Sequence, residues 1–242
     1  GGPPVTILGI ETATMVCGAA LVSDGRVVAE RWVEERSVHA ERLFGLIDDV
    51  LMEGENTLRD LDAIAVSIGP GSFTGLRIGL SAAKGLHMAL GIPVVAVPTL
   101  AALARRSVSH FDGRQGHILA ALDARRDEVY SQLFSVGGSQ MRELGEVQAR
   151  TVRELAAALP EGELLLTGDA RQKVASLLLG DTPGASASRV HEGVVVADAS
   201  LARCSAAEVA LLGEQLVRGR QYADPAALEP QYVKEVFLST PH

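Results

Sequence analysis

The sequence predicts an α/β protein of two similar lobes, each built on a β-β-β-α-β-α unit. Short apolar runs and helical spacings give that order over the first hundred residues, and a similar order returns afterwards. The two halves also agree locally, because Ile7-Leu8 precede Glu11 as Ile118-Leu119 precede Asp123. Duplication of such a unit is typical of the actin-like fold, also called the ASKHA or ribonuclease-H-like fold.

The first lobe is predicted over residues 1–110. Asp24-Gly25 is a strong hairpin signal between two of its strands. Apolar residues at helical spacing then predict two long helices, Val38–Met52 and Ser72–Leu90, and a shorter one, Thr99–Ser107. The strands of this lobe are expected at Val5–Ile10, Val16–Ser23, Arg26–Glu34, Leu61–Ile68 and Pro93–Val97.

The second lobe is predicted over residues 111–242. Gly137-Gly138 marks a turn, and Thr151 with Glu154 forms a capping box that begins a helix. Strands are expected at His117–Leu122, Glu128–Ser135, Gln140–Val147 and Glu163–Thr167. After them we expect a helix at Asp169–Leu179, a loop with one short strand at Gly180–Val196, a helix at Ser200–Arg218 and a Pro-bearing tail at Asp224–Lys234.

Composition favours a soluble cytoplasmic protein. Apolar residues make up 47% of the 242, yet no run of about 18 consecutive apolar residues occurs, so no spanning helix is expected. The N-terminal Gly1-Gly2-Pro3-Pro4 lacks a basic segment followed by a long apolar one, so no secretory signal is expected. Two distant cysteines, Cys17 and Cys204, fit a reducing compartment better than a disulfide.

The charge balance argues against independent RNA binding. The 22 basic and 30 acidic side chains give a net charge of −8, which repels phosphate backbones on average. If RNA is involved, another subunit should supply much of the positive charge.

The most distinctive motif is the glycine-rich segment Gly69–Gly79, which follows a strand and opens a helix. Free N–H groups at a helix start attract anions, so one interpretation is a phosphate or carboxylate site. The other is close packing at a strand-to-helix turn. The motif lacks the Gly-Lys-Ser/Thr ending of a P-loop. The weak anion or nucleotide candidates are Glu11, Thr12, Gly69, Gly71, Ser72 and Thr74.

The two long helices are the candidate protein–protein interface. Ser72–Leu90 is apolar or small nearly all round, and Val38–Met52 carries an apolar arc of roughly 160°, wider than one sheet face needs. A well-covered core is the alternative. A charge at Gly79 or Ala83 is expected to block pairing without unfolding the lobe. The candidate interface residues are His39, Leu43, Leu46, Ile47, Val50, Gly75, Arg77, Gly79, Ala82, Ala83, Leu86 and His87.

Catalytic motifs are incomplete. An actin-like kinase needs a glycine- and threonine-rich hairpin with an aspartate after the first strand of each lobe. Here the segments are Glu11–Thr14, with no glycine at the turn, and Asp123–Arg126, with none at all. We therefore expect no ATP hydrolysis, no cofactor of its own and at most weak ATP or ADP binding at a complex interface. The six histidines form no His-Glu-x-x-His or His-x-x-x-His pair, so no metal site and no catalytic residue is assigned.

Several segments in order along the chain resemble the TsaB (YeaZ) family. They are Ile7–Thr12, His39–Leu43, Gly69–Gly79, Asp123–Tyr130 and Glu229–Val233. The resemblance implies an actin-like fold and a non-catalytic subunit of the complex that attaches threonylcarbamoyl to the adenosine beside the anticodon of transfer RNA.

The resemblance also implies partners. They are the transferase TsaD, the small ATPase TsaE, a second copy when the chain is alone, and transfer RNA indirectly through the complex. It places the pairing surface on the first two helices, and it differs at Glu11, where the family usually has Asp. TsaD itself has a His-x-x-x-His pair, absent here. Two other classes stay open: an actin-like ATP-binding kinase or ATPase, and a glycoprotease-type peptidase.

Overall fold

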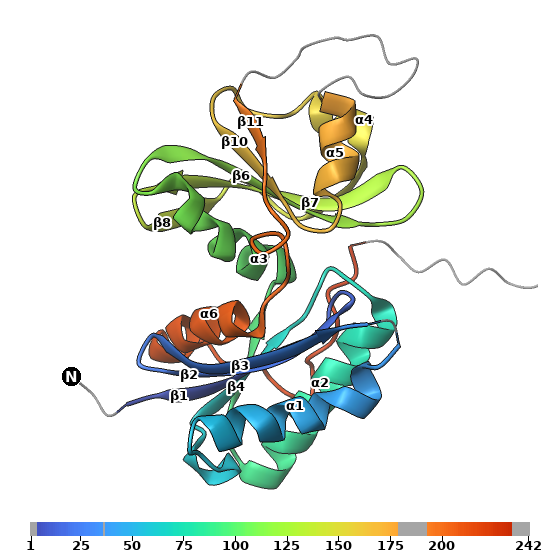
Figure 1. The fold of residues 1–242 in the computed structure, drawn as a ribbon. Helices are drawn as coiled ribbons and strands as arrows, with labels where there is room; N and C mark the ends of the chain where they lie inside the picture. Colours follow the sequence, from blue (N-terminus) through green and yellow to red (C-terminus); the bar gives the residue numbers. More distant parts are fainter. Residues whose placement is uncertain (1–3, 36, 179–192, 234–242) are drawn as a thin grey trace, which may run out of the picture.

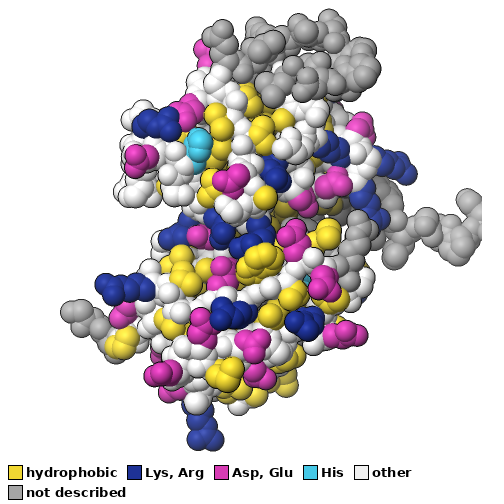
Figure 2. All heavy atoms as spheres, in the orientation of Figure 1, with side chains coloured by type: hydrophobic (Ala, Val, Ile, Leu, Met, Phe, Trp, Pro, Cys, Tyr) yellow, Lys and Arg dark blue, Asp and Glu magenta, His cyan; other side chains and the backbone are white. Residues whose placement is uncertain are grey.

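The computed structural model of the chain describes residues 4–35, 37–178 and 193–233. It consists of two β-sheets, one per lobe, separated by a layer of helices and covered by further helices on their outer faces (Figure 1). No helix in these ranges is long and apolar enough to cross a membrane. Charges of both signs scatter over the visible face, and Lys and Arg side chains gather at the waist between the lobes (Figure 2).

The first sheet has the strand order β3-β2-β1-β4-β5. β1 pairs antiparallel with β2 and parallel with β4, so the mixed sheet expected of each lobe is present. The near-continuous apolar runs of β1, β2 and β4 are buried on both faces, as central strands require. The bounds are β1 Thr6–Glu11, β2 Val16–Ser23, β3 Arg26–Glu34, β4 Ala63–Ser67 and β5 Val94–Val97.

Helices cover both faces of this sheet. α1 (His39–Glu53) and α2 (Phe73–Leu90) pack on one face, where Leu8, Ile10 and Ile64 join their apolar side chains in one core. The other face, with Ile7, Ala65 and Val95, is covered by α6 (Ala206–Arg218). A short 3₁₀ helix, η1 (Leu58–Asp60), precedes β4 and was not predicted.

The second sheet has the order β11-β10-β6-β7-β8, with β9 also paired to β7. The face toward the first lobe is covered by α3 (Thr99–Ser107), which continues into η2 (Val108–Phe111). The outer face is covered by α4 (Val152–Ala156) and α5 (Arg171–Leu178). The strands are β6 Gln115–Asp123, β7 Glu128–Gly137, β8 Gln140–Glu143, β9 Gln148–Thr151, β10 Leu164–Thr167 and β11 Val194–Val196.

Two local predictions need correction, and a third is confirmed for its described part. The strand predicted over Gln140–Val147 ends at Glu143, and β9 starts only at Gln148, because both segments pair with different parts of β7. The last helix begins at Ala206 rather than Ser200, where Ser205 accepts the N-cap hydrogen bond from Glu208. Residues 179–192 of the predicted loop lie outside the described ranges, and the short strand expected there corresponds to β11.

The residues that follow the second sheet, from α6 to Gln231, return to the first lobe. α6 lies on the first sheet although it follows the second in sequence, so it belongs in space to the lobe that the sequence assigned to residues 1–110 (Figure 1). The backbone N–H groups of Ala223 and Gln231 then donate to the carbonyls of Val94 and Ile68. Leu228 is buried in the core beneath α1 and α2. Residues 206–231 therefore complete the packing of the first lobe.

Candidate docking groove and the glycine-rich loop

A shallow apolar groove of about 570 Å³ runs along the outer surface between α1 and α2. Most of its lining is apolar or small, which is unusual for a surface that faces water. One guanidinium, that of Arg77, stands among these side chains. The groove is lined by Ala40, Leu43, Phe44, Phe73, Thr74, Arg77, Ile78, Ser81, Ala82 and Gly85.

Three of the predicted interface residues line this groove: Leu43, Arg77 and Ala82. Most of the others lie beneath it in the lobe core, where the side chains are buried. These core residues are Leu46, Ile47, Val50, Ala83 and Leu86. The two helices were thus chosen mainly from residues that hold them on the sheet; of the three that line the groove, Leu43 and Ala82 are buried and Arg77 is exposed.

Both histidines of the predicted interface are bonded within the chain. His39 is buried, and its Nε2 lies 2.9 Å from the carbonyl of Thr14 and 3.2 Å from that of Val16. Two carbonyls can only accept, so Nε2 carries the proton and donates. The Nδ1 of His87 lies 2.8 Å from the carbonyl of Ile92 and donates likewise. Both side chains hold turns at helix ends rather than facing a partner.

The large exposed apolar side chains of these two helices lie outside the predicted set. Phe44 is 52% exposed and Phe73 is 44% exposed, and Met52 and Met88 stand further along the same two helices at 75% and 83%. The width of the apolar arc on α1 was the signal that could have found Phe44, because an arc wider than the sheet must leave some members outside.

Glycines allow close approach at the groove. A Cβ built on Gly45 or on Gly85 meets no atom within 4 Å, so neither glycine is required by packing inside the lobe. Glycine in a helix interior costs about 1 kcal/mol relative to alanine. Gly85 lines the groove, so a second helix can approach α2 closely at that point, whereas Gly45 lies on α1 outside the lining.

The end of the described chain borders the groove. The Tyr232 ring stacks on Phe73 with centroids 5.4 Å apart, and the Arg77 guanidinium lies 4.0 Å from the centroid of the same ring. Phe73 is therefore held by one aromatic and one cationic contact, which together fix its position at the rim.

The glycine-rich loop is packed against the turn between β1 and β2. A Cβ on Gly71 would lie 2.2 Å from the carbonyl oxygen of Ala13, and one on Gly75 would lie 2.1 Å from that of Thr12. The N–H of Ser72 donates to the Ala13 carbonyl, and the N–H of Gly75 donates to the Ser72 hydroxyl. These glycines let two backbones touch, and the contact uses N–H groups that an anion would need.

Gly79 faces the same turn. A Cβ there would lie 2.3 Å from the Thr12 hydroxyl oxygen, and Ala83 is fully buried one turn further on. The structure contradicts the expectation that a charge at either position leaves the lobe folded, because an arginine at Gly79 would collide with Thr12 and one at Ala83 would be buried in the core. The effect on pairing stays a prediction.

Glu11 is completely buried beside this loop. Its Oε1 accepts from the Ala13 N–H at 2.6 Å, while among the described residues its Oε2 and the Thr12 hydroxyl have no hydrogen-bond partner. Burial raises the pKa of Glu11 from 4.5 to about 7, against the smaller lowering effect of hydrogen bonds from Ala13 and Ser67. The carboxyl is thus largely protonated below neutral pH.

We predict that Glu11→Gln removes a pH dependence of stability. The pKa of Glu11 in the folded chain (about 7) exceeds its ordinary value of 4.5. The free energy of unfolding of the wild type is therefore highest below pH 4.5, decreases between pH 4.5 and 7, and is constant above pH 7. The loss is about 3 kcal/mol for a shift of this size. Urea unfolding at pH 5 and pH 8 should show the variant more stable than wild type at the higher pH only. The same change in the free energy of unfolding between pH 5 and pH 8 in both proteins would contradict this prediction.

The matching turn of the second lobe is also occupied by its own chain. The Asp123 carboxylate pairs with the Lys173 ammonium at 2.8 Å, and the Asp123 N–H donates to Asp169 at 2.7 Å. Burial raises the pKa of Asp169. Arg125 and Arg126 both have a positive φ. In a glycine-rich phosphate-binding hairpin, glycines would occupy positions with this conformation. Neither turn thus presents an open phosphate cradle, and the described residues contain no cluster of three or more His, Cys, Asp or Glu that could hold a metal.

Two comparisons with known proteins indicate the family of this chain. A protein-family model described as "TsaD: tRNA N6-adenosine threonylcarbamoyltransferase" matches residues 34–220. The solved structure "YeaZ from Pseudomonas aeruginosa" is similar with a TM-score of 0.76 and 30% sequence identity, over 94% of this chain and 99% of that one. The chain belongs to the TsaB (YeaZ) family.

Curated members of the TsaB family are similar over part of their length. The tRNA threonylcarbamoyladenosine biosynthesis protein TsaB of Escherichia coli (strain K12) is 40% identical over 124 residues, which are 51% of this chain and 52% of that protein. The Bacillus subtilis (strain 168) protein of the same name is 38% identical over 130 residues, 54% of this chain and 55% of that protein. The chain spans about half the length of the curated relatives it matches. Family and fold class are as the sequence predicted.

Proposed function

We propose that this chain takes part in tRNA threonylcarbamoyladenosine biosynthesis as a non-catalytic subunit that pairs with TsaD through the groove between α1 and α2. The observation that carries the proposal is the pair of exposed aromatic side chains, Phe44 and Phe73, on an otherwise apolar groove. Such a surface gains free energy when a second protein covers it.

The turns between the lobes support the non-catalytic part of the proposal. The backbone of the glycine-rich loop contacts Thr12 and Ala13, and Asp123 is engaged by Lys173, so the groups that a phosphoryl-transfer site would use are committed to the fold. We propose that the chain acts in the cytoplasm and carries no cofactor of its own. ATP or ADP would bind only weakly, where the partner completes the site.

Charge supports an indirect relation to RNA. With a net charge of −8, the chain is a poor phosphate-binding surface by itself, so TsaD would supply the main contact with transfer RNA. TsaE would join the pair as a third subunit. In the absence of TsaD, the same apolar groove would pair with that of a second copy, because one surface can serve both partners in turn.

The test is reconstitution. The chain is purified alone and together with TsaD of the same organism. Light scattering measures the molar mass of the particles in each sample. Threonylcarbamoyl transfer to transfer RNA is then assayed on the same samples. We expect a stable complex, transfer that requires the chain, and no transfer by the chain alone. Failure to form a complex, or ATP turnover by the isolated chain in calorimetry with magnesium, would overturn the proposal and favour a kinase-like function.

A further inference from the structure

The two helices that flank the docking groove carry charges of opposite sign. α1 has four acidic residues and only Arg42 as a permanent cation, whereas α2 has the cations Arg77 and Lys84 and no acidic residue. Glu53, in the last turn of α1, is already paired with Arg31 of β3. The other three carboxylates of α1 form no ion pair within the described ranges. The groove therefore has an acidic side and a basic side.

Glu41 and Asp48 form the acidic side. Both side chains are exposed, and they lie two turns apart on one face of α1. Asp48 lies about 40° round the helix from the groove residue Phe44, whereas Asp49 lies about 140° from it. A partner that covers Phe44 would therefore meet Asp48, while Asp49 would stay in water.

Arg77 and Lys84 form the basic side. They are two turns apart on α2, and both line a pocket of about 220 Å³ between this helix and residues 228–232. Arg77 also lines the docking groove, so the pocket and the groove adjoin. Glu229 lines the pocket as well, yet neither cation forms an ion pair with it or with another carboxylate of the described residues. Unmatched cations beside an apolar surface favour a partner that brings carboxylates.

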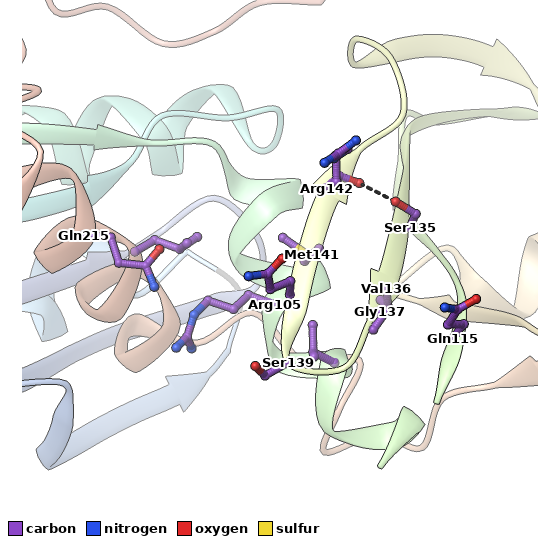
Figure 3. Close-up of a pocket in the computed structure, with 12 residues that line it drawn as sticks. Arg105, Gln115, Ser135, Val136, Gly137, Ser139, Met141, Arg142 and Gln215 are labelled. Carbon is purple, nitrogen blue, oxygen red and sulfur yellow. Dashed lines mark hydrogen bonds between the residues drawn. The ribbon is translucent and has the colours of Figure 1, made fainter. Parts of the chain in front are cut away.

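The arginines that line the cavity of about 810 Å³ between the lobes differ from this pair. Arg105 extends toward α6, where it pairs with Glu208 (Figure 3). Arg142 follows Met141 on β8, and successive side chains of a strand point to opposite faces. Because Met141 packs on the core that contains α3, Arg142 faces away from Arg105. The two arginines of this cavity therefore do not converge, and the one toward the first lobe is already matched.

We propose, on the basis of the pairing with TsaD proposed above, that the docking groove takes a TsaD helix whose acidic side lies against α2 and whose basic side lies against α1. An apolar stripe between these two sides would cover Phe44 and Phe73, which is the usual way for a helix to bind in a groove. Like charges brought together would disfavour the helix with its sides exchanged. The charges beside the groove thus select the partner and determine how it lies.

A second copy of the chain is the competing occupant. A two-fold axis along the groove would place α1 of each copy over α2 of the other, so the acidic and basic sides would match there too. Reversing both sides at once separates the two occupants. A self-pairing surface regains its match in the double variant, whereas TsaD meets the wrong sign on both sides.

The experiment is titration calorimetry of the full chain with TsaD of the same organism, at about 50 mM and about 500 mM salt, because salt screens exposed charges. Asp48→Lys and Lys84→Glu should each weaken the Kd about tenfold at the lower salt. The double variant should weaken it about a hundredfold, since distant effects add. All three losses should shrink at the higher salt.

The matched control is Asp49→Lys. It makes the same change of charge as Asp48→Lys one residue further along α1, at a side chain that points away from the groove. Its Kd should equal that of the wild type. Lys84→Gln removes the charge of Lys84 without reversing it and should weaken the Kd only about threefold. Urea unfolding checks that every variant is folded.

The outcomes separate this proposal from the pairing on which it rests. If the wild type does not bind TsaD, both fail. If the wild type binds but Asp48→Lys weakens the Kd no more than Asp49→Lys, the pairing stands and the charged sides play no part in it. Recovery of the wild-type Kd in the double variant would contradict the proposed signs. Light scattering of the chain alone would assign the charges to a second copy if the single variants lose self-association while their Kd for TsaD is unchanged.

Discussion

Phe44→Asp is expected to abolish pairing with TsaD while leaving the chain folded. Phe44 is 52% exposed and lines the groove, so its replacement removes no side chain from the lobe core. In the complex the aspartate would be buried in a mostly apolar groove whose one lining cation, Arg77, already contacts Phe73, and the aromatic contact of Phe44 would be lost. Together these effects amount to about 3 kcal/mol or more, a Kd at least 100-fold weaker.

The matched control places the same charge elsewhere on α1. Arg42 is also exposed, and it lies about 160° round the helix from the groove side chains Ala40 and Phe44 and about 100° from Leu43. Arg42→Asp should therefore pair normally. Titration calorimetry gives both Kd values, and urea unfolding confirms that both variants fold. Equal weakening by the two variants, or undiminished pairing by Phe44→Asp, would show that the groove is not the docking surface.

Gly9→Val is expected to destabilise the chain by about 3 kcal/mol or more, at the upper end of what overpacking costs. A Cβ on Gly9 would lie 2.2 Å from the carbonyl oxygen of Ala206 and 2.8 Å from the Cβ of Ala210. Both neighbours belong to α6, and one of them is backbone, so the helix as a whole must move off the sheet. Urea unfolding should show a lower midpoint with a similar slope.

Gly45→Ala is the control for this second variant. A Cβ on Gly45 meets nothing within 4 Å, and alanine favours a helix over glycine by about 1 kcal/mol, so this variant should gain stability. A midpoint for Gly9→Val equal to that of the wild type would contradict the close packing of α6 on β1.

Local chemistry in the sequence was enough for most elements. Asp24-Gly25 marks the β2–β3 hairpin, and Gly25 has the positive φ that the turn requires. Ser72 caps α2 by accepting from Gly75, and the Thr151–Glu154 capping box begins α4. Each of these signals acts over a few residues, so it can be read without knowing the tertiary structure.

The position of α6 could not be predicted in the same way. Its apolar face would suit either sheet, and the choice depends on a close fit in space. Gly213 illustrates this, because a Cβ there would lie 2.3 Å from that of Ala65. Such complementarity between residues nearly 150 positions apart leaves no periodic pattern in the sequence. Chain order alone therefore assigned α6 to the second lobe.

The candidate interface was predicted at the level of helices and only partly at the level of residues. Periodicity shows that α1 and α2 are apolar on a wide arc, but it does not show which part of the arc meets the sheet. Leu43 reaches the groove, whereas Leu46 and Ile47 lie in the core beneath. Phe44 belongs to the wide apolar arc, but only its exposure separates it from the core members, and Phe73 was found from its exposure.

The return of α6 and the residues after it to the first sheet has a consequence for synthesis on the ribosome. Ile7, Ala65 and Val95 are made before the second lobe, yet the helix that covers them, Ala206–Arg218, is made after it. The nascent first lobe must therefore keep one apolar face exposed while the whole second sheet is translated. A messenger broken upstream of the α6 codons would yield a product that could not complete this lobe, and chaperones and proteases would act on it.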